Sequence, residues 1–263
     1  MLIAGTLSLL VHSLKDVPTV MPDGCEIGAN TKRADPRDAF VVRADSKYTR
    51  IQDLPAGSVI GTSSIRRTAQ IALKFPHLKV QDLRGNIDTR LRRLDEEGSQ
   101  YDAIIIAAAG LIRIEQSNRI NQLLSSSDGG MLYAVGQGAI GIENRIDDDR
   151  VKKIMSTINH LPTFFATSAE RSLLRTIEGG CSAPLGVESD WLDDRHLRLS
   201  AIVVSVDGKE FAEAVAEEYV QSFEDAERLG QVVAADLLRA GGDKILSEIK
   251  AKKPTTPADL LEV

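Results

Sequence analysis

The chain has 263 residues, of which 43% are hydrophobic and 27% charged, a composition ordinary for a globular protein of two or three domains. Its formal net charge of −6 argues against a general nucleic-acid-binding protein, which usually carries a basic surface. No run of about eighteen or more apolar residues is present, so we expect no membrane-spanning segment. The two cysteines, Cys25 and Cys181, lie far apart, which fits a reducing compartment such as the cytoplasm better than a disulfide scaffold.

Short apolar runs separated by polar loops occupy the first half of the chain. Residues 1–11 lack the basic region and cleavage site of a signal peptide, so we expect a buried strand there, followed by a loop that contains Pro18 and Pro22. The strands expected in this half are residues 7–11, 39–42, 59–61, 80–83 and 102–108.

Two helices are expected between these strands. One begins after cap candidates at residues 62–64 and runs to about Phe75, and another follows residues 84–86 and stops at Gly98. A turn is expected to start at Gly110. The alternation of strand, loop and helix over residues 58–113 predicts βαβ units and a mostly parallel sheet.

The pattern changes after a loop or linker at residues 125–130. From about His160 onward we expect an α+β domain of about a hundred residues. Its expected elements are a helix opened by a capping box at Thr167-Ser168-Ala169-Glu170 and running to about Ile177, strands at residues 197–206 and 211–220 joined by a turn at Asp207-Gly208, and a helix over residues 225–250 broken or kinked at Gly241-Gly242.

Cationic side chains recur in the loops that follow the expected strands, although the chain is acidic overall. Because ligands of open α/β sheets bind at the carboxyl ends of the strands, these residues could converge. They would form a pocket for a small polyanion, with one carboxylate among the cations. The residues concerned are Lys15, Asp16, Arg66, Arg67, Arg84 and Arg113.

Three arginines carry a more specific signal. Arg66 and Arg67 lie in the first turn of their helix, where cations oppose the helix dipole and the backbone N–H groups favour an anion. Arg90 lies beside the apolar stripe of the next helix, so a planar anionic partner would suit it. The alternative is that these arginines form structural salt bridges within the protein.

Other patterns in the sequence are weaker indications of function. Cys181 follows two glycines in a loop, where an exposed thiol suits attachment or nucleophilic chemistry, or is incidental. The glycines at residues 136, 138 and 141 match a dinucleotide-binding pattern, but the residues that follow, 140–146, are strand-like rather than helical. The histidines are scattered, so no metal site is expected.

Taken together, the motifs resemble those of the hydroxymethylbilane synthase (porphobilinogen deaminase) family, in the family's order and over the whole chain. They are Val11-His12-Ser13-Leu14-Lys15-Asp16-Val17-Pro18-Thr19, Asp35-Pro36-Arg37-Asp38-Ala39, Gly61-Thr62-Ser63-Ser64-Ile65-Arg66-Arg67, Asp82-Leu83-Arg84-Gly85-Asn86 with Thr89-Arg90-Leu91, Ala109-Gly110-Leu111 with Arg113, Ala134-Val135-Gly136-Gln137-Gly138-Ala139, and Gly179-Gly180-Cys181-Ser182-Ala183-Pro184.

The resemblance implies an α/β protein with two domains like type II periplasmic binding proteins and a third, α+β domain. The chain would cross between the first two near residues 35–39 and return near residues 134–143. The implied domains are residues 1–38 with 134–157, residues 39–133, and residues 158–263, the last carrying the cofactor attachment.

The resemblance also implies an enzyme, a transferase that condenses four porphobilinogen molecules head to tail, with release of ammonia, into linear hydroxymethylbilane for heme biosynthesis. Cys181 would hold a dipyrromethane cofactor through a thioether, and Asp16 would be the catalytic aspartate. The enzyme is expected to be a cytoplasmic monomer. Cofactor and substrate binding is implied for Ser13, Lys15, Thr62, Ser63, Ser64, Arg66, Arg67, Arg84, Gly85, Arg90 and Arg113.

One departure concerns the start of the chain. Family members have a Gly-Thr-Arg-x-Ser-x-Leu-Ala strand and a helix before the point where this sequence begins. The first domain would then be truncated and expose a sheet edge and apolar surface, so the chain is expected to be weakly active or inactive.

Two other interpretations stay open. A solute-binding or sensor module would clamp a carboxylate ligand with Arg66, Arg67 and Arg84, and would bind it reversibly without needing Cys181 or Asp16. A folded remnant would keep the structure and lack the activity.

Overall fold

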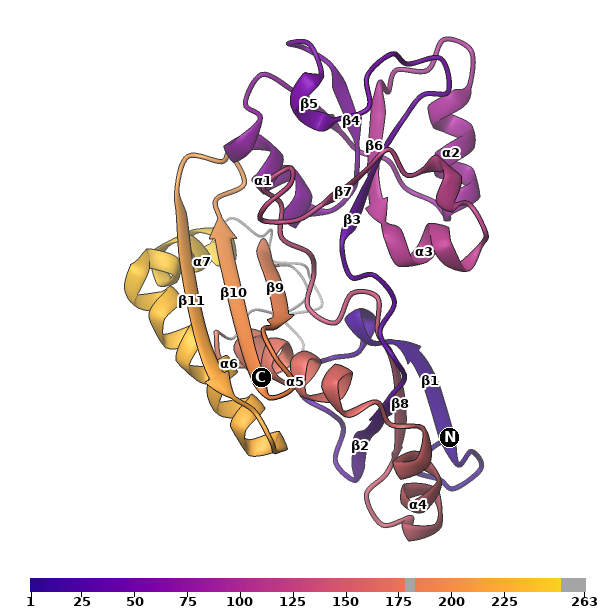
Figure 1. Ribbon diagram of the computed structural model, residues 1–263, viewed down its shortest axis with the longest axis vertical. Coiled ribbons are helices and arrows are strands. Elements are labelled where there is room, and N and C mark those ends of the chain that lie inside the picture. The colour runs from indigo at the N-terminus through magenta and orange to yellow at the C-terminus, as the bar shows by residue number, and fades with distance from the viewer. Residues whose placement is uncertain (178–182, 252–263) are drawn as a thin grey trace.

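The computed structural model describes residues 1–177 and 183–251, which form three β-sheets with their helices (Figure 1). The five-stranded sheet lies at the top of the view, a small three-stranded sheet lies below it, and a second three-stranded sheet lies beside both. The structure is therefore mixed α/β, as the sequence predicts. Among the described residues, no helix is long and apolar enough to cross a membrane.

The five-stranded sheet has the order β5-β4-β6-β3-β7. Its strands are β3 (Asp38–Val42), β4 (Val59–Gly61), β5 (Lys79–Gln81), β6 (Ala103–Ala107) and β7 (Gln122–Leu124). Strand β4 is parallel to β5 and β6, whereas β3 is antiparallel to its two neighbours. The predicted parallel arrangement over residues 58–113 is confirmed, and the unpredicted antiparallel β3 makes the sheet mixed.

Helices cover both faces of this sheet. They are α1 (Ile65–Lys74), α2 (Ile87–Asp95) and α3 (Ala108–Arg113). Successive residues of β6 belong to different cores: Ile105 packs with Ile71 of α1, and Ile104 packs with Leu94 of α2. This two-sided burial explains the continuous apolar run of β6. The turn predicted at Gly110 is wrong, because Gly110 lies inside α3, where a Cβ would come 2.5 Å from Ile87 Cδ1.

The small sheet is antiparallel, in the order β1-β8-β2. It consists of β1 (Leu9–Ser13), β8 (Ile140–Arg145) and β2 (Cys25–Asn30), and helix α4 (Asp149–Ile158) packs on it through Val151 and Met155. The prediction of a buried strand here is wrong, because within the described residues β1 is an edge strand and Val11 on it is 61% exposed. A short 3₁₀ helix, η1 (Leu14–Asp16), follows β1 and carries Lys15 and Asp16.

The remaining sheet, β11-β10-β9, is an antiparallel meander backed by helices. Its elements are α5 (Leu161–Thr176), β9 (Leu185–Trp191), β10 (His196–Val204), β11 (Phe211–Tyr219), α6 (Phe223–Leu237) and α7 (Asp243–Ala251). Gly208 in the predicted hairpin turn has a φ of +72°. The predicted break is also confirmed: a π turn at Leu238–Gly242 separates α6 from α7, and Gly241 there has a φ of +103°.

The capping box predicted at residues 167–170 is wrong, because α5 already begins at Leu161. His160 caps the helix by accepting a hydrogen bond from the Thr163 backbone N–H, and Pro162 occupies the first turn, where its missing N–H costs nothing. Thr167 and Glu170 therefore lie mid-helix and buried, and both bind residues of other elements. The strands and α-helices that the sequence did not predict are β2, β7, β9, α3 and α4.

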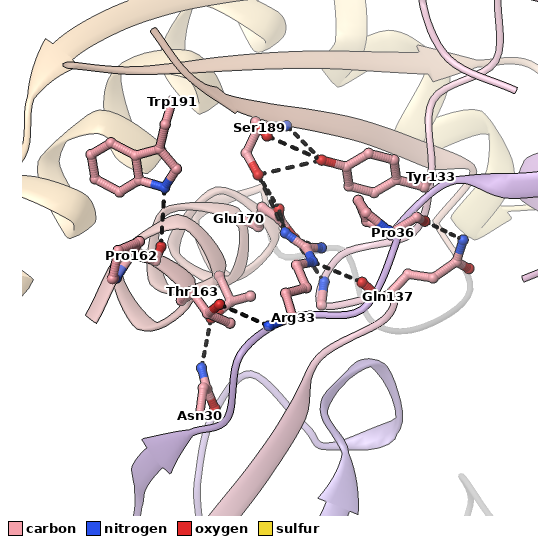
Figure 2. A network of polar contacts seen from close by, with 12 residues as sticks. Asn30, Arg33, Pro36, Tyr133, Gln137, Pro162, Thr163, Glu170, Ser189 and Trp191 are labelled. Atoms are coloured by element: carbon pink, nitrogen blue, oxygen red, sulfur yellow. Dashed lines mark hydrogen bonds and ion pairs between the residues drawn. The ribbon is translucent and has the colours of Figure 1, made fainter. Parts of the chain in front are cut away.

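A buried ion pair between Arg33 and Glu170 joins the segment that follows β2 to helix α5 (Figure 2). The Arg33 Nη1 and Nη2 atoms lie 2.6 and 3.0 Å from the Glu170 carboxylate oxygens, and Arg33 Nε donates to the Gln137 carbonyl at 2.9 Å. Glu170 Oε2 also accepts from the Gly136 backbone N–H at 2.8 Å, and Ser189 of β9 donates to Oε1 at 2.7 Å. The Glu170 carboxylate thus joins the two segments that cross between the small sheet and the five-stranded sheet, which contain Arg33 and Gly136, to strand β9.

Glycines allow the two crossing segments to touch. Gly138 has a φ of +82°, and a Cβ added to it would lie 2.7 Å from the Ala34 carbonyl oxygen. Gly136 has a φ of +70° and lies against Leu14 and Lys15. The strand that follows, β8, agrees with the prediction for residues 140–146, and it stands where a dinucleotide-binding fingerprint requires a helix.

We expect Gly138→Ala to destabilise the protein by about 1–3 kcal/mol, because the new methyl group combines a left-handed backbone with a backbone clash. Gly57→Ala is the matched control: its φ is +87°, but no described atom lies within 4 Å of the new Cβ. Chemical denaturation of both variants measures the difference. Equal losses of stability would show that the crossing tolerates the extra atom.

Candidate active site

A cationic cavity of about 220 Å³ lies between the small sheet and the five-stranded sheet, at the end of β6. Four cationic side chains from four separate segments line it: Lys15, Arg67, Arg90 and Arg113. Ser13, Gly85 and the crossing residues 137–139 complete the wall. The predicted convergence of residues that follow different strands is therefore present for these side chains.

A second cavity of about 290 Å³ shares Lys15 with the first. Ser63, Ser64 and Arg66 line it from the start of α1, and Ala183 lines it from the segment just before β9. Lys15 thus stands between two neighbouring hollows. Together they offer an extended basic site with hydroxyl groups along it.

A buried carboxylate holds the two arginines of α1. Asp38 Oδ2 lies 2.8 Å from Arg66 Nη2, and Arg67 binds both Asp38 oxygens, at 2.7 Å through Nη2 and 3.1 Å through Nε. Gln137 Nε2 donates to Asp38 Oδ1 at 2.8 Å. Burial alone would raise the pKa of Asp38, but the charges of Arg66 and Arg67 and the hydrogen bonds from Arg67 and Gln137 hold it below its ordinary value.

Arg66 and Arg67 accordingly have internal partners, as the salt-bridge alternative predicts. Arg66 also donates to the Leu132 carbonyl and Arg67 to the Ile105 carbonyl, and both side chains are buried. One carboxylate cannot neutralise two guanidinium groups, so positive charge remains at the start of α1. Arg67 directs this charge into the first cavity, since it lines that cavity while bound to Asp38.

The other cations are oriented by backbone carbonyls. Arg90 Nε donates to the Gly85 carbonyl at 2.7 Å, and Arg113 Nη2 donates to the Gly138 carbonyl at 2.9 Å. Burial, with the nearby charge of Arg67, lowers the pKa of Arg90. Partial desolvation by the surrounding protein, with the nearby charge of Arg67, also lowers the pKa of the Lys15 ammonium. These mutually repelling cations favour an anionic ligand.

Some residues singled out from the sequence lie elsewhere. Arg84 is exposed, pairs with Asp82 at 3.0 Å, and does not line either cavity. Thr62 is buried, and its Oγ1 accepts from the Ser64 N–H at 3.2 Å, which supports the loop before α1. Asp16 is exposed in η1 beside Lys15. Cys181 lies outside the described residues, and Ala183, two positions later, lines the second cavity.

Sequence reasoning missed Asp38 and Gln137. Their signal was weak: Asp38 is a charged residue at the start of an apolar run, and Gln137 lies between two glycines. Another cavity, about 660 Å³ and lined by Arg33, Arg37 and Glu188, lies elsewhere. Its arginines are neutralised by Glu170 and Asp35, so it lacks the excess of cations found beside Lys15. No group of three or more metal-binding side chains occurs in the described ranges.

Comparisons with known proteins agree along most of the chain. Residues 1–153 match the family model described as porphobilinogen deaminase, dipyromethane cofactor binding domain, and residues 164–239 match the model of the porphobilinogen deaminase C-terminal domain. Among curated relatives, the porphobilinogen deaminase of Neurospora crassa is 47% identical over 243 residues, which cover 90% of this chain and 72% of that protein. The Yarrowia lipolytica enzyme is 49% identical over 92% of this chain and 70% of its own length.

Solved structures add little. The methionine-binding protein MetQ matches with a TM-score of 0.34 and 16% identity, covering 56% of this chain and 66% of its own. YhfZ from Shigella flexneri matches with a TM-score of 0.32 and 12% identity, covering 67% and 72%. Scores this low establish no common fold.

We expect Asp38→Asn to lower the free energy of unfolding by about 3–5 kcal/mol near neutral pH, because it leaves two buried guanidinium groups without their carboxylate. Since folding lowers the pKa of Asp38 below 3.8, its stabilisation is complete above about pH 5 and is lost as the pH falls through and below 3.8. The difference in the free energy of unfolding between the parent and Asp38→Asn should narrow over that pH range. The exposed Asp45→Asn, which loses only its pair with Arg43, should change little. A gap independent of pH would contradict the ionised state of Asp38.

Proposed function

The chain belongs to the porphobilinogen deaminase family, and we propose that its two basic cavities hold the dipyrromethane cofactor and the growing pyrrole chain. The family consists of transferases, the hydroxymethylbilane synthases of tetrapyrrole and heme biosynthesis. They condense four porphobilinogen molecules head to tail and release ammonia. The proposal concerns which residues of this chain carry out that work.

The observation that carries the proposal is the convergence of Lys15, Arg67, Arg90 and Arg113 on one cavity. Each pyrrole unit of the substrate bears an acetate and a propionate, so two linked units carry four carboxylates. Guanidinium groups bind carboxylates through paired, charge-assisted hydrogen bonds. The residues present therefore fit a polycarboxylate, and the neighbouring cavity with Ser63 and Ser64 provides room for further units.

We assign the covalent attachment to Cys181. Ala183, two positions later in the sequence, lines the second cavity, which supports this assignment. The attached group supplies a free pyrrole α-position that accepts each new substrate unit. The protein would then use Arg67, Arg90 and Arg113 to orient the substrate carboxylates, so that each new pyrrole reaches the same position.

We assign the catalytic role to Asp16. Asp16 is exposed on η1 and directly follows Lys15, which lines both cavities. There it would stabilise positive charge on the pyrrole nitrogens and assist the departure of ammonia, an electrostatic and acid–base role. Lys15, at the preceding position, binds substrate carboxylates and places its positive charge beside the negative charge of Asp16.

The domain assignment is also a proposal: residues 1–38 with 134–157, residues 39–133, and residues 158–263. The three separate sheets support it, because each falls within one of these units apart from Asp38, the first residue of β3. The family models change between residues 153 and 164, which supports the boundary near 158. A likeness of the first two units to type II periplasmic binding proteins, cytoplasmic location and a monomeric state complete the proposal.

The intact mass of the protein after incubation with porphobilinogen tests the attachment. We expect the parent chain to gain the mass of two linked pyrrole units and Cys181→Ser to gain none. Cys25→Ser is the matched control, because Cys25 is buried in the small sheet and should not affect loading. An unmodified parent, or an adduct that survives in Cys181→Ser, would refute the assignment, and reversible binding without an adduct would favour a solute-binding module.

Two arginines of the same helix test the binding site. Arg90→Met removes a guanidinium from the cavity, and we expect kcat/KM for porphobilinogen to fall about 10- to 100-fold, the value of a charged hydrogen bond. Arg92→Met, which removes only an exposed pair with Glu96, should leave kcat/KM at the parent level. If both variants behave alike, Arg90 does not bind substrate.

A further inference from the structure

Two arginines of helix α5 bind the backbone of the loop that follows Asp16. Arg171 Nη1 donates to the Val17 carbonyl at 3.0 Å, and its Nη2 donates to the Pro18 carbonyl at 2.6 Å. Arg175 Nη1 donates to the Thr19 carbonyl at 3.3 Å. Three successive carbonyl groups are therefore bound by two side chains that lie four residues apart on one face of α5.

The loop has few hydrogen bonds of its own. Among the described contacts, the Val17 N–H donates to the Leu14 carbonyl, and Pro18 and Pro22 have no N–H to donate. A segment of this kind forms neither a strand nor a helix without outside donors. The guanidinium groups supply them, and hydrogen bonds from a charged donor are stronger than neutral ones.

The arginines are themselves firmly placed. Arg171 is buried, with 9% of its surface exposed. Arg175 forms an ion pair with Glu227 of α6, whose backbone carbonyl accepts a hydrogen bond from Ser172 Oγ at 2.8 Å. The loop is therefore attached to the best-packed contact of the third unit, the pair of helices α5 and α6.

The same helix leads toward Cys181. α5 ends at Thr176, five positions before that cysteine, and the loop that it binds begins directly after Asp16. The neighbouring Glu170 serves a different contact, since it points to Arg33 in the crossing segment. Arg171 and Arg175 thus connect the acidic residue of the first unit to the element that precedes the attachment residue.

We propose that Arg171 and Arg175 are positioning residues, which fix Asp16 relative to the cofactor by holding residues 17–19 against α5. This inference rests on the roles proposed above for Asp16 and Cys181. Neither arginine lines either of the two basic cavities. Their effect on the reaction passes through the backbone of the loop, so loss of the contact should slow turnover more than it weakens substrate binding.

Amide hydrogen exchange and steady-state kinetics of Arg171→Met test this. We expect exchange at residues 14–20 to rise about tenfold or more, with helix α6 unchanged, since the released carbonyls no longer restrain the loop. The pyrrole adduct should remain, kcat should fall about tenfold or more, and KM should change less than about threefold. Arg171→Lys, which keeps a charge and a donor, should recover part of kcat.

Further variants separate the possible failures. Arg175→Met removes the longer contact and should give a smaller change of the same kind, which keeps the test valid if Arg171→Met does not fold. Arg198→Met, which removes an exposed pair between Arg198 on β10 and Glu217 on β11, should match the parent. A loaded parent with unchanged exchange and kcat in Arg171→Met would overturn this inference alone. A parent that gains no pyrrole mass would overturn the proposed function instead.

Discussion

The buried carboxylate of Asp38 is the constraint on which the site depends. It receives hydrogen bonds from Arg66, Arg67 and Gln137, and so joins the start of β3, the start of α1 and the returning crossing segment. A charge buried this deeply is tolerable only with such partners. Because two guanidinium groups share it, the cluster keeps a net positive charge, which Arg67 presents to the cavity shared with Lys15. One interaction therefore stabilises the crossing and supplies part of the binding charge.

A second ion pair, between Arg33 and Glu170, stabilises the fold alone. Arg33 and Glu170 hold the crossing segments against the third sheet, and Gly138 lets those segments approach closely. The two ion pairs differ in what remains for a ligand. Arg33 is fully matched by Glu170, so the larger cavity beside it has little unbalanced charge, whereas the smaller cavity beside Lys15 keeps an excess of cations. The balance of charge, rather than the volume, distinguishes the candidate site.

Local signals made much of the fold predictable. The apolar runs of β4 and β6 and the cap at Ser64 are visible in the sequence because each depends on neighbouring residues. The start of α5 was misplaced because Thr167 and Glu170 resemble a cap, whereas their real partners, Asn30 and Arg33, lie more than a hundred residues away. Arg84 and Arg90 show the same limit: both belong to recognisable motifs, but only the folded chain reveals that one points to solvent and the other into the cavity. Tertiary partners decide such cases, and a single sequence does not contain them.

The most direct test of the central claim is a crystal structure of the protein after incubation with porphobilinogen. The account predicts two linked pyrroles in the cavity lined by Lys15, Arg67, Arg90 and Arg113, joined to Cys181, with their carboxylates within hydrogen-bonding distance of those cations while Asp38 still binds Arg66 and Arg67. Pyrroles bound elsewhere, for example in the larger cavity beside Arg33, or bound without contact to these cations, would contradict it.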